Sequence, residues 1–270
     1  MAKIHSTAIV APEAQLADDI EIGPYSIIGP EVKIGKGCTI DAYVQIKGKT
    51  SIGENNKFFH AARVGEIPQD FTFNNPSAHV VIGNGNTFRE FSTVHLPVKA
   101  EQPTTIGDNN YFMNNSHIAH DCQVGNNCVT VSNAALGGYA ILGNNSYISA
   151  YAAVHQFCRV GSFAMLTPHT KCSQDVPPFV LSEGSPAVAH SLNTVGMKRG
   201  GVGPQARSLI KQAFKLVYMR NLPVSRAVQE IEKELLAGLD KTSDEFKWLN
   251  LFTSFIKESK RGVIAFHKRH

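Results

Sequence analysis

The sequence has little of what marks several classes of protein. Its 270 residues include one Trp and five Cys, and only 18% are charged, against 43% hydrophobic. This balance excludes an intrinsically disordered chain and a long coiled coil. An odd number of cysteines without a CxxC pair argues against a disulfide framework or a zinc ribbon. Free cysteines in a reducing compartment are the simpler interpretation.

Long apolar runs are also missing. No stretch approaches the roughly 20 apolar residues of a membrane span. The first fifteen residues, MAKIHSTAIVAPEAQ, lack the apolar segment of a signal peptide. We therefore expect a cytoplasmic protein without membrane insertion. The formal net charge of +4 favours an anionic partner and does not require nucleic acid.

A six-residue period runs through the first two thirds of the chain. Of 26 positions in one phase, all but two are Ile, Val, Leu or Phe. The phase comprises Ile4, Val10, Leu16, Ile22, Ile28, Ile34, Ile40, Ile46, Ile52, Phe58, Val64, Ile82, Phe88, Val94, Ile106, Phe112, Ile118, Val124, Thr130, Leu136, Leu142, Ile148, Val154, Val160, Leu166 and Cys172. Four residues after most of these positions the side chain is small, and glycine often follows directly, where we expect positive φ at a corner.

Two inward positions in each hexad, one large and one small, describe a short strand between bends. Helical spacings of three and four are absent. Short strands cannot bury an apolar face alone, so three hexads form an 18-residue coil and successive coils stack about 4.8 Å apart. The pattern predicts a β-solenoid, a parallel β-helix over residues 1–190. Its interruptions at 67–81 and 96–105 are expected to leave the coils as surface loops near a binding face.

A change of pattern after about Val176 predicts an α-helical C-terminal domain over residues 191–270. Pro204 and Pro223 are suited to first turns of helices. Three helical stripes follow: Leu209, Ala213, Leu216 and Arg220; Val224, Val228, Ile231 and Leu235; and Phe246, Leu249, Phe252 and Ile256. We expect these helices to cover the open end of the solenoid, where an unpaired strand edge would invite aggregation.

The densest polar cluster within the regular coils is Asn114–Cys122. Its phase points Ile118 and Cys122 inward, which places His120 and Asp121 on an exposed outward wall. An imidazole beside a carboxylate is suited to general-base catalysis near neutral pH. Gly138 follows His120 by 18 residues and should lie beside it in the next coil, with its N–H open to a developing oxyanion.

A one-sided run of positive charge lies between Gly184 and Gln229. It contains no Asp or Glu and seven basic residues: Lys198, Arg199, Arg207, Lys211, Lys215, Arg220 and Arg226. A run of one sign favours an acidic protein or a diphosphate as partner. Nucleic acid is not expected, because no aromatic stacking platform accompanies the run.

Four motifs in order carry a resemblance to a known family. They are GEIPQD at Gly65–Asp70, HIAHDC at His117–Cys122, VHQF at Val154–Phe157 and QDVPPF at Gln174–Phe179. With the hexads and the helical tail, they make nearly the whole chain similar to the UDP-N-acetylglucosamine 3-O-acyltransferases, a hexapeptide-repeat acyltransferase family.

The resemblance implies a left-handed β-helix, a homotrimer with active sites between subunits, and acyl carrier protein as donor. The family moves a (3-hydroxy)acyl chain to the 3-hydroxyl of UDP-N-acetylglucosamine, the first step of lipid A biosynthesis, and neither a metal nor another cofactor is expected. It implies that His120 is the base, Asp121 orients it and Gly138 binds the oxyanion. Further matched positions are expected to hold the nucleotide sugar or the acyl arm: Gln69, Asp70, His117, Tyr139, His155, Gln156 and Arg199. The basic residues 198–220 would form the patch for acyl carrier protein.

This chain departs from the family pattern at several positions. Thr72 stands where a Lys is common, Leu96 where an Arg is common, and Tyr139 where a His is common. Three alternatives therefore stay open. They are a paralogous N-acyltransferase for a 3-amino sugar nucleotide, a zinc hydratase resembling the γ-class carbonic anhydrases, and a non-catalytic scaffold. The hydratases use three histidines on one metal with an HxxxxH spacing, which His117 and His120 do not match.

Overall fold

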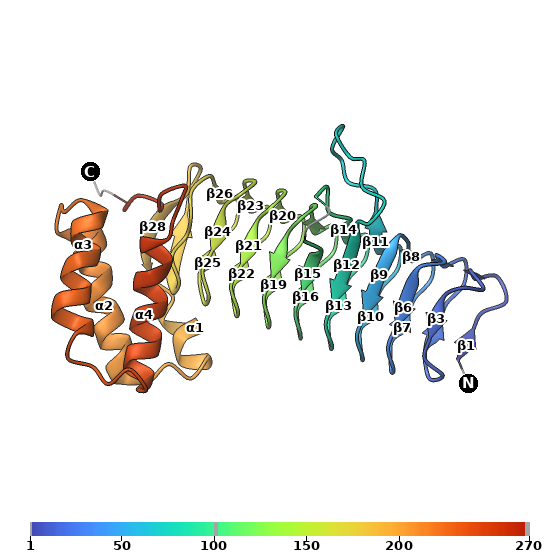
Figure 1. Cartoon of the computed structure of the whole chain (residues 1–270), viewed down its shortest axis with the longest axis horizontal. Helices are drawn as coiled ribbons and strands as arrows, with labels where there is room; N and C mark the ends of the chain where they lie inside the picture. Colours follow the sequence, from blue (N-terminus) through green and yellow to red (C-terminus); the bar gives the residue numbers. More distant parts are fainter. Residues whose placement is uncertain (1, 100–101, 268–270) are drawn as a thin grey trace.

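The structure is a computed structural model that describes residues 2–99 and 102–267. Residues 1 and 268–270, at the outer ends of the two predicted domains, lie outside the described residues, as do residues 100–101 of the second predicted loop. Figure 1 shows a long prism of stacked coils with a group of helices at its C-terminal end.

The coils contribute short strands to three sheets. The 11-stranded sheet contains β1 (Lys3–Ile4), β4 (Glu21–Ile22), β7 (Thr39–Ile40), β10 (Lys57–Phe58), β13 (Thr87–Phe88), β16 (Tyr111–Phe112), β19 (Val129–Thr130), β22 (Tyr147–Ile148), β25 (Met165–Leu166), β27 (Val180–Glu183) and β28 (Val188–Leu192). The 9-stranded sheet contains β2 (Ile9–Val10), β5 (Ile27–Ile28), β8 (Gln45–Ile46), β11 (Arg63–Glu66), β14 (Thr93–His95), β17 (His117–Ile118), β20 (Ala135–Leu136), β23 (Ala153–Val154) and β26 (Lys171–Cys172). The 8-stranded sheet contains β3 (Gln15–Leu16), β6 (Val32–Ile34), β9 (Lys49–Ile52), β12 (His79–Ile82), β15 (Thr104–Ile106), β18 (Gln123–Val124), β21 (Ile141–Leu142) and β24 (Arg159–Val160).

Strand pairing follows the predicted 18-residue register. Ile118 pairs with Leu136, which pairs with Val154, and both ladders are parallel. Among the described strands, only β27 and β28, at the end of the solenoid, pair antiparallel. The predicted fold class, a left-handed parallel β-helix of hexapeptide repeats followed by α-helices, is confirmed.

The large inward side chains form the core of the prism. From Ile22 onward they are buried, including the two exceptions to the pattern, Thr130 and Cys172. Ile4 remains 45% exposed because it lies in the first coil, which has no coil before it. All five cysteines are buried and free, as expected for small apolar fillers.

A stack of three phenylalanine rings crosses the coils that carry the two loops. The ring of Phe88 lies between those of Phe58 and Phe112, with centroids 4.8 and 4.9 Å away, and all three are fully buried. We expect Phe88→Ala to lower the free energy of unfolding by about 3–5 kcal/mol, since it leaves a cavity between two rings. Chemical denaturation at fixed protein concentration measures this. A loss below about 1 kcal/mol would contradict the packing described.

Glycines after the inward residues have a different role from the one predicted. Among those in the described coils, only Gly65 has a positive φ, of +76°. The left-handed corner residues lie two positions later and are mostly aromatic, Asn or Asp, such as Tyr25 and Asp121, both at φ +58°. A Cβ on Gly137 would lie 2.8 Å from the backbone nitrogen of Gln156. Glycine is therefore required by the close approach of the next coil.

Both predicted loops are shorter than expected. The first connects β11 to β12, which starts at His79, and the second connects β14 to β15, which starts at Thr104. Their last residues pair with neighbouring strands, although the hexad phase resumes only at Ile82 and Ile106. Figure 1 shows the first loop projecting from the prism.

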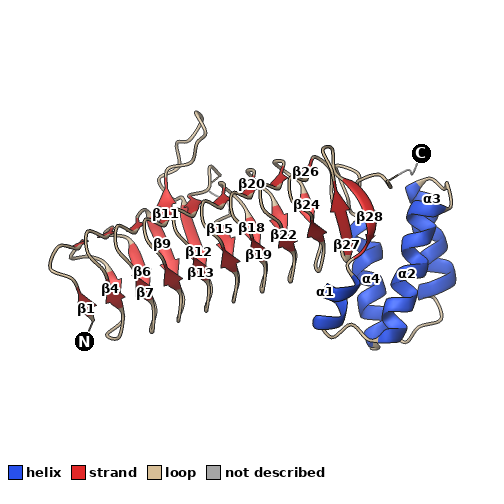
Figure 2. Ribbon diagram, turned by 180° about the vertical axis from the view of Figure 1, so that it is seen from behind, coloured by secondary structure: helices blue, strands red, loops and turns tan. Residues whose placement is uncertain are grey.

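The C-terminal helices pack against one another at the end of the prism (Figure 2). They are α1 (Thr194–Arg199), α2 (Pro204–Met219), α3 (Val224–Ile231), the π-helix η1 (Glu232–Leu236) and α4 (Asp244–Lys257). In α4, the Trp248 ring meets Phe163 and Phe179 of the last coils edge-on, at 5.6 and 6.3 Å. None of the helices in the described ranges has the length and apolar character needed to cross a bilayer.

The predicted stripe of α2 is wrong in part. Its buried residues are Ala206, Ile210, Ala213, Phe214 and Val217. Leu209 and Leu216 are only partly buried, at the margin of this face. The helix runs from Pro204 to Met219 and packs against α3 and α4. The face that it buries against them is rotated about the helix axis from the predicted stripe.

Candidate functional site

His120 and Asp121 form a hydrogen-bonded pair at the corner between β17 and β18. His120 Nδ1 lies 2.8 Å from Asp121 Oδ2. The side chains are only 13% and 5% exposed, so the expectation of an exposed wall is wrong. The loop after β14 lies over the carboxylate and covers it: the backbone N–H groups of Val98 and Lys99 donate to its two oxygens. Asp121 is therefore the more enclosed member of the pair.

Gly138 lies directly beside the His120 ring in the next coil. A Cβ built on Gly138 would lie 2.3 Å from Cε1 and 2.4 Å from Nε2 of His120. The Tyr139 N–H donates to the His120 carbonyl at 3.0 Å, which fixes the two coils in this register. Among the described residues, no acceptor is hydrogen-bonded to the Gly138 N–H. A free backbone donor therefore lies next to the Nε2 edge of the imidazole.

Aromatic rings line the same corner above Asp121. The Tyr139 ring meets His120 edge-on at 5.2 Å and stacks on Phe157 at 4.5 Å with an interplanar angle of 7°. The Lys99 ammonium lies 5.2 Å from the Tyr139 ring centroid. Burial, together with the charges of Asp121 and Asp70, raises the pKa of the Tyr139 phenol. Tyr139 is therefore a neutral hydrogen-bond donor at physiological pH.

A second histidine group lies on β17 and the neighbouring strand β14. His117 Nδ1 is 2.8 Å from Thr93 Oγ1, and its ring meets that of His95 edge-on at 4.9 Å. Sequence reasoning missed both Thr93 and His95. The insertion between β14 and β15 hides the signal, since it makes Thr93 pair with His117 over 24 residues rather than 18. His95 falls directly after the inward residue Val94, at the end of β14.

Burial lowers the pKa of His117 to about 4, and the charges of His95 and His120 act in the same direction. A folded-state pKa below that of a free histidine means that the unfolded chain binds the proton more tightly. The free energy of unfolding should therefore fall as pH drops from about 6.5 towards 4. His117→Gln should reduce that fall, and urea titrations at pH 7 and 4.5 compare the two proteins. An equal pH dependence would contradict a buried neutral His117.

The predicted residues of the first loop lie within electrostatic reach of the pair. Asp70 accepts hydrogen bonds from the N–H and hydroxyl of Thr72, which lower its pKa, and the charge of His120 lowers it further. Gln69 is exposed beside it. Thr72, which stands where the resembling family often has Lys, thus orients the Asp70 carboxylate.

His155 and Gln156 lie in the coil that follows Gly138, and both are exposed. His155 Nδ1 is 3.2 Å from the Gln156 carbonyl, and the Phe157 N–H donates to the Gly138 carbonyl. The structure thus stacks His120, Gly138 and Gln156 in three successive coils. Arg199 is not part of this group: it lies exposed at the end of α1, among the C-terminal helices (Figure 2).

With this geometry in place, comparison with known proteins is decisive. Residues 103–138 match the family described as bacterial transferase hexapeptide (six repeats), and residues 175–264 match UDP N-acetylglucosamine O-acyltransferase, domain 2. The acyl-[acyl-carrier-protein]–UDP-N-acetylglucosamine O-acyltransferase of Herminiimonas arsenicoxydans is 41% identical over 265 residues, 98% of this chain and 100% of that protein. The chain belongs to this family of acyltransferases.

Solved structures agree. UDP-N-acetylglucosamine acyltransferase from Campylobacter jejuni is 35% identical, with a TM-score of 0.89 over 98% of this chain and 100% of that one. The enzyme of the same name from Francisella novicida is 33% identical, with a TM-score of 0.89 over 97% and 94%. The family resemblance seen in the four motifs is thus confirmed. The chain is an acyltransferase, not a zinc hydratase or a scaffold.

The basic residues of this acyltransferase lie mainly on α1 and α2. Lys198, Lys211, Lys215 and Arg220 are exposed. Arg207 differs from them, because it is half-buried and donates a hydrogen bond to the Val202 carbonyl. Of the predicted basic patch, the exposed part therefore comprises Lys198, Arg199, Lys211, Lys215 and Arg220.

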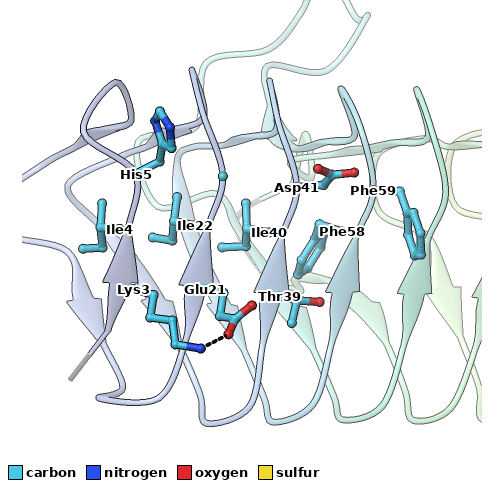
Figure 3. Close-up of a pocket in the computed structure, with 11 residues that line it drawn as sticks. Lys3, Ile4, His5, Glu21, Ile22, Thr39, Ile40, Asp41, Phe58 and Phe59 are labelled. Atoms are coloured by element: carbon cyan, nitrogen blue, oxygen red, sulfur yellow. Dashed lines mark hydrogen bonds and ion pairs between the residues drawn. The ribbon is translucent and has the colours of Figure 1, made fainter.

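Two larger hollows of the acyltransferase lie away from this corner. One, of about 580 Å³, runs along the first coils, where Ile4, Ile22 and Ile40 form a row above the Lys3–Glu21 ion pair (Figure 3). Another, of about 1010 Å³, lies between α2 and the C-terminal segment. Beside Asp121 and Tyr139 the cavity measures only about 290 Å³. Cavity volume alone therefore does not locate the candidate active site. The hydrogen-bonded His120–Asp121 pair locates it instead.

The part of the chain that the structure describes contains no group of three His, Cys, Asp or Glu side chains arranged to hold a metal ion. His95 and His117 are neighbours, but Nδ1 of His117 is engaged with Thr93.

Proposed function

We propose that the chain transfers an acyl group from acyl carrier protein to the 3-hydroxyl of UDP-N-acetylglucosamine, with His120 as general base and without a metal. This is the first step of lipid A biosynthesis. One observation carries the mechanism: the imidazole bonded to Asp121 presents its other edge to Gly138, a residue without a side chain. The names of the relatives support the two substrates.

The His120–Asp121 pair accounts for each proton transfer in this step. Asp121 accepts the Nδ1–H of His120, which leaves Nε2 as the free acceptor. Nε2 takes the proton of the sugar 3-hydroxyl as that oxygen attacks the thioester carbonyl. The Gly138 N–H donates to the oxyanion that forms. The C–S bond then breaks, and the imidazolium returns the proton to the departing thiolate of the carrier.

Substrate contacts are part of the proposal. Gln69, Asp70, His117, Tyr139, His155, Gln156 and Arg199 hold the nucleotide sugar or the acyl arm. Exposure of His155 and Gln156 supports this assignment, since both are accessible beside Gly138. The enzyme acts in the cytoplasm as a homotrimer whose neighbouring subunit encloses the site. Arg199 is distant from His120 of the same subunit. It would then contact a bound acyl carrier protein or the active site of a neighbouring subunit.

A transfer assay with purified protein tests the proposed reaction. Acyl carrier proteins loaded with acyl and 3-hydroxyacyl chains of several lengths are offered with UDP-N-acetylglucosamine or with its 3-amino analogue. Mass spectrometry identifies the product. We expect O-acylation of the natural sugar to have the higher kcat/KM. Preference for the amine would replace the proposal with a nucleotide-sugar N-acyltransferase.

Charge reversal at Lys211 and Lys215 tests the carrier surface. Lys211→Glu/Lys215→Glu should raise KM for the acylated carrier about 10-fold or more at low salt, and the difference should shrink as salt screens the charges. KM for the sugar nucleotide should not change. The matched control is Lys233→Glu/Lys241→Glu, a pair that is equally exposed but outside the basic run. Equal effects of the two double variants on KM would show that acyl carrier protein does not bind at this surface.

A further inference from the structure

We propose that the segment Leu96–Lys99 is a clamp that positions Asp121 for catalysis, and that Leu96 anchors it. This inference rests on the proposed function of the His120–Asp121 pair. It assigns a role to the segment in which Leu96 departs from the common family pattern, and nothing in the base mechanism requires it.

The carboxylate of Asp121 receives three donors from two directions. Val98 N–H donates to Oδ2 at 2.9 Å, Lys99 N–H donates to Oδ1 at 3.3 Å, and His120 Nδ1 lies 2.8 Å from Oδ2. At the start of β15, the buried Thr104 hydroxyl accepts the N–H of Asp121 at 2.9 Å. Val98 and Lys99 therefore contact the side chain of this residue, and Thr104 contacts its backbone.

Those contacts restrict the carboxylate to one orientation. An aspartate that is free to rotate about its side-chain bonds offers the imidazole an acceptor only part of the time. With both oxygens occupied by fixed backbone donors, the remaining acceptor direction on Oδ2 points at Nδ1. The carboxylate of Asp121 is thus held facing the imidazole before any substrate binds.

Leu96 fixes the clamp to the coil beneath it. Its side chain is only 7% exposed, and its N–H donates to the Glu66 carbonyl at 2.9 Å. The site it fills is created by Gly48: a Cβ on Gly48 would lie 3.0 Å from Leu96 Cδ1. Pro97 follows directly and restricts the backbone between the anchor and the two donors. Loss of the anchor would release Val98 and Lys99 without touching the catalytic pair.

The test is a double-mutant cycle between Leu96→Ala and Asp121→Asn. We expect Leu96→Ala to lower kcat about 10-fold, with KM for UDP-N-acetylglucosamine within about 2-fold, since a small misplacement of a catalytic group affects the chemical step. In the Asp121→Asn background the same substitution should change kcat by less than about 2-fold. Leu96→Met, which keeps the volume, should restore most of the activity. Leu16→Ala, at a partly buried leucine in the first coil, controls for general destabilisation.

The outcomes separate the clamp from the mechanism. Unchanged kcat in Leu96→Ala overturns the clamp. So does a 10-fold loss that persists in Asp121→Asn, because Leu96 would then act through the fold instead of through Asp121. If His120→Ala and Asp121→Asn both retain normal turnover, the base mechanism fails and the clamp fails with it. If both are impaired while Leu96→Ala is normal, only the clamp is refuted.

Discussion

His120→Ala should lower kcat for acyl transfer about 100-fold or more, the scale expected for loss of a general base. Without the imidazole, the nearest described histidine in sequence, His117, cannot take over as the acceptor at Nε2, because it lies in β17 and its Nδ1 is engaged with Thr93. KM for UDP-N-acetylglucosamine should change little, since the proposed sugar contacts come from other residues. Steady-state kinetics at saturating acylated carrier measures the effect.

The matched control for this variant is His5→Ala, which removes an exposed imidazole in the first coil. It should have normal kinetics. Circular dichroism and size-exclusion chromatography should show that His120→Ala keeps its fold and assembly, because His120 lies at a corner outside the hydrophobic core. Turnover within a few-fold of the natural protein would refute the assignment of the base.

Gly138→Ala should be almost as damaging, although it adds a single methyl group. The new Cβ would lie 2.3–2.4 Å from two atoms of the His120 ring, so the imidazole must move away. Its displacement separates Nε2 from the Gly138 N–H and strains the bond to Asp121. We expect kcat to fall about 100-fold, the effect of about 1 Å of misplacement in a catalytic group.

Gly203→Ala is the control for Gly138→Ala. Gly203 precedes α2, and a Cβ there would meet nothing within 4 Å. It should leave both stability and turnover near normal. Full activity in Gly138→Ala, together with an unchanged His120 resonance in NMR, would show that the close contact between the two residues has no importance for the reaction.

The solenoid could be predicted from sequence because its rule is local and repeated. An inward Ile, Val, Leu or Phe every six residues specifies strand, corner and stacking at once, and parallel pairing at +18 follows from three hexads per coil. This register also placed Gly138 beside His120. Both predictions depend only on counting along an uninterrupted stretch, and residues 106–172 provide one.

The features that could not be predicted from the sequence lie where the six-residue period is interrupted. The second loop changes the spacing from 18 to 24 residues, so Thr93 and His95 did not appear beside His117. The same loop returns over Asp121, which made an apparently exposed pair nearly buried. Glycines after the inward residues fit either positive φ or close coil approach, and only the three-dimensional spacing distinguishes these reasons.

The most direct measurement is a single-turnover transfer with enzyme in excess over the acylated carrier and with saturating UDP-N-acetylglucosamine. This isolates the chemical step from product release. The account predicts that the rate constant of His120→Ala falls about 100-fold or more, while equilibrium binding of the sugar nucleotide stays within a few-fold. Equal rate constants for His120→Ala and the natural protein would contradict the assignment of His120 as the base.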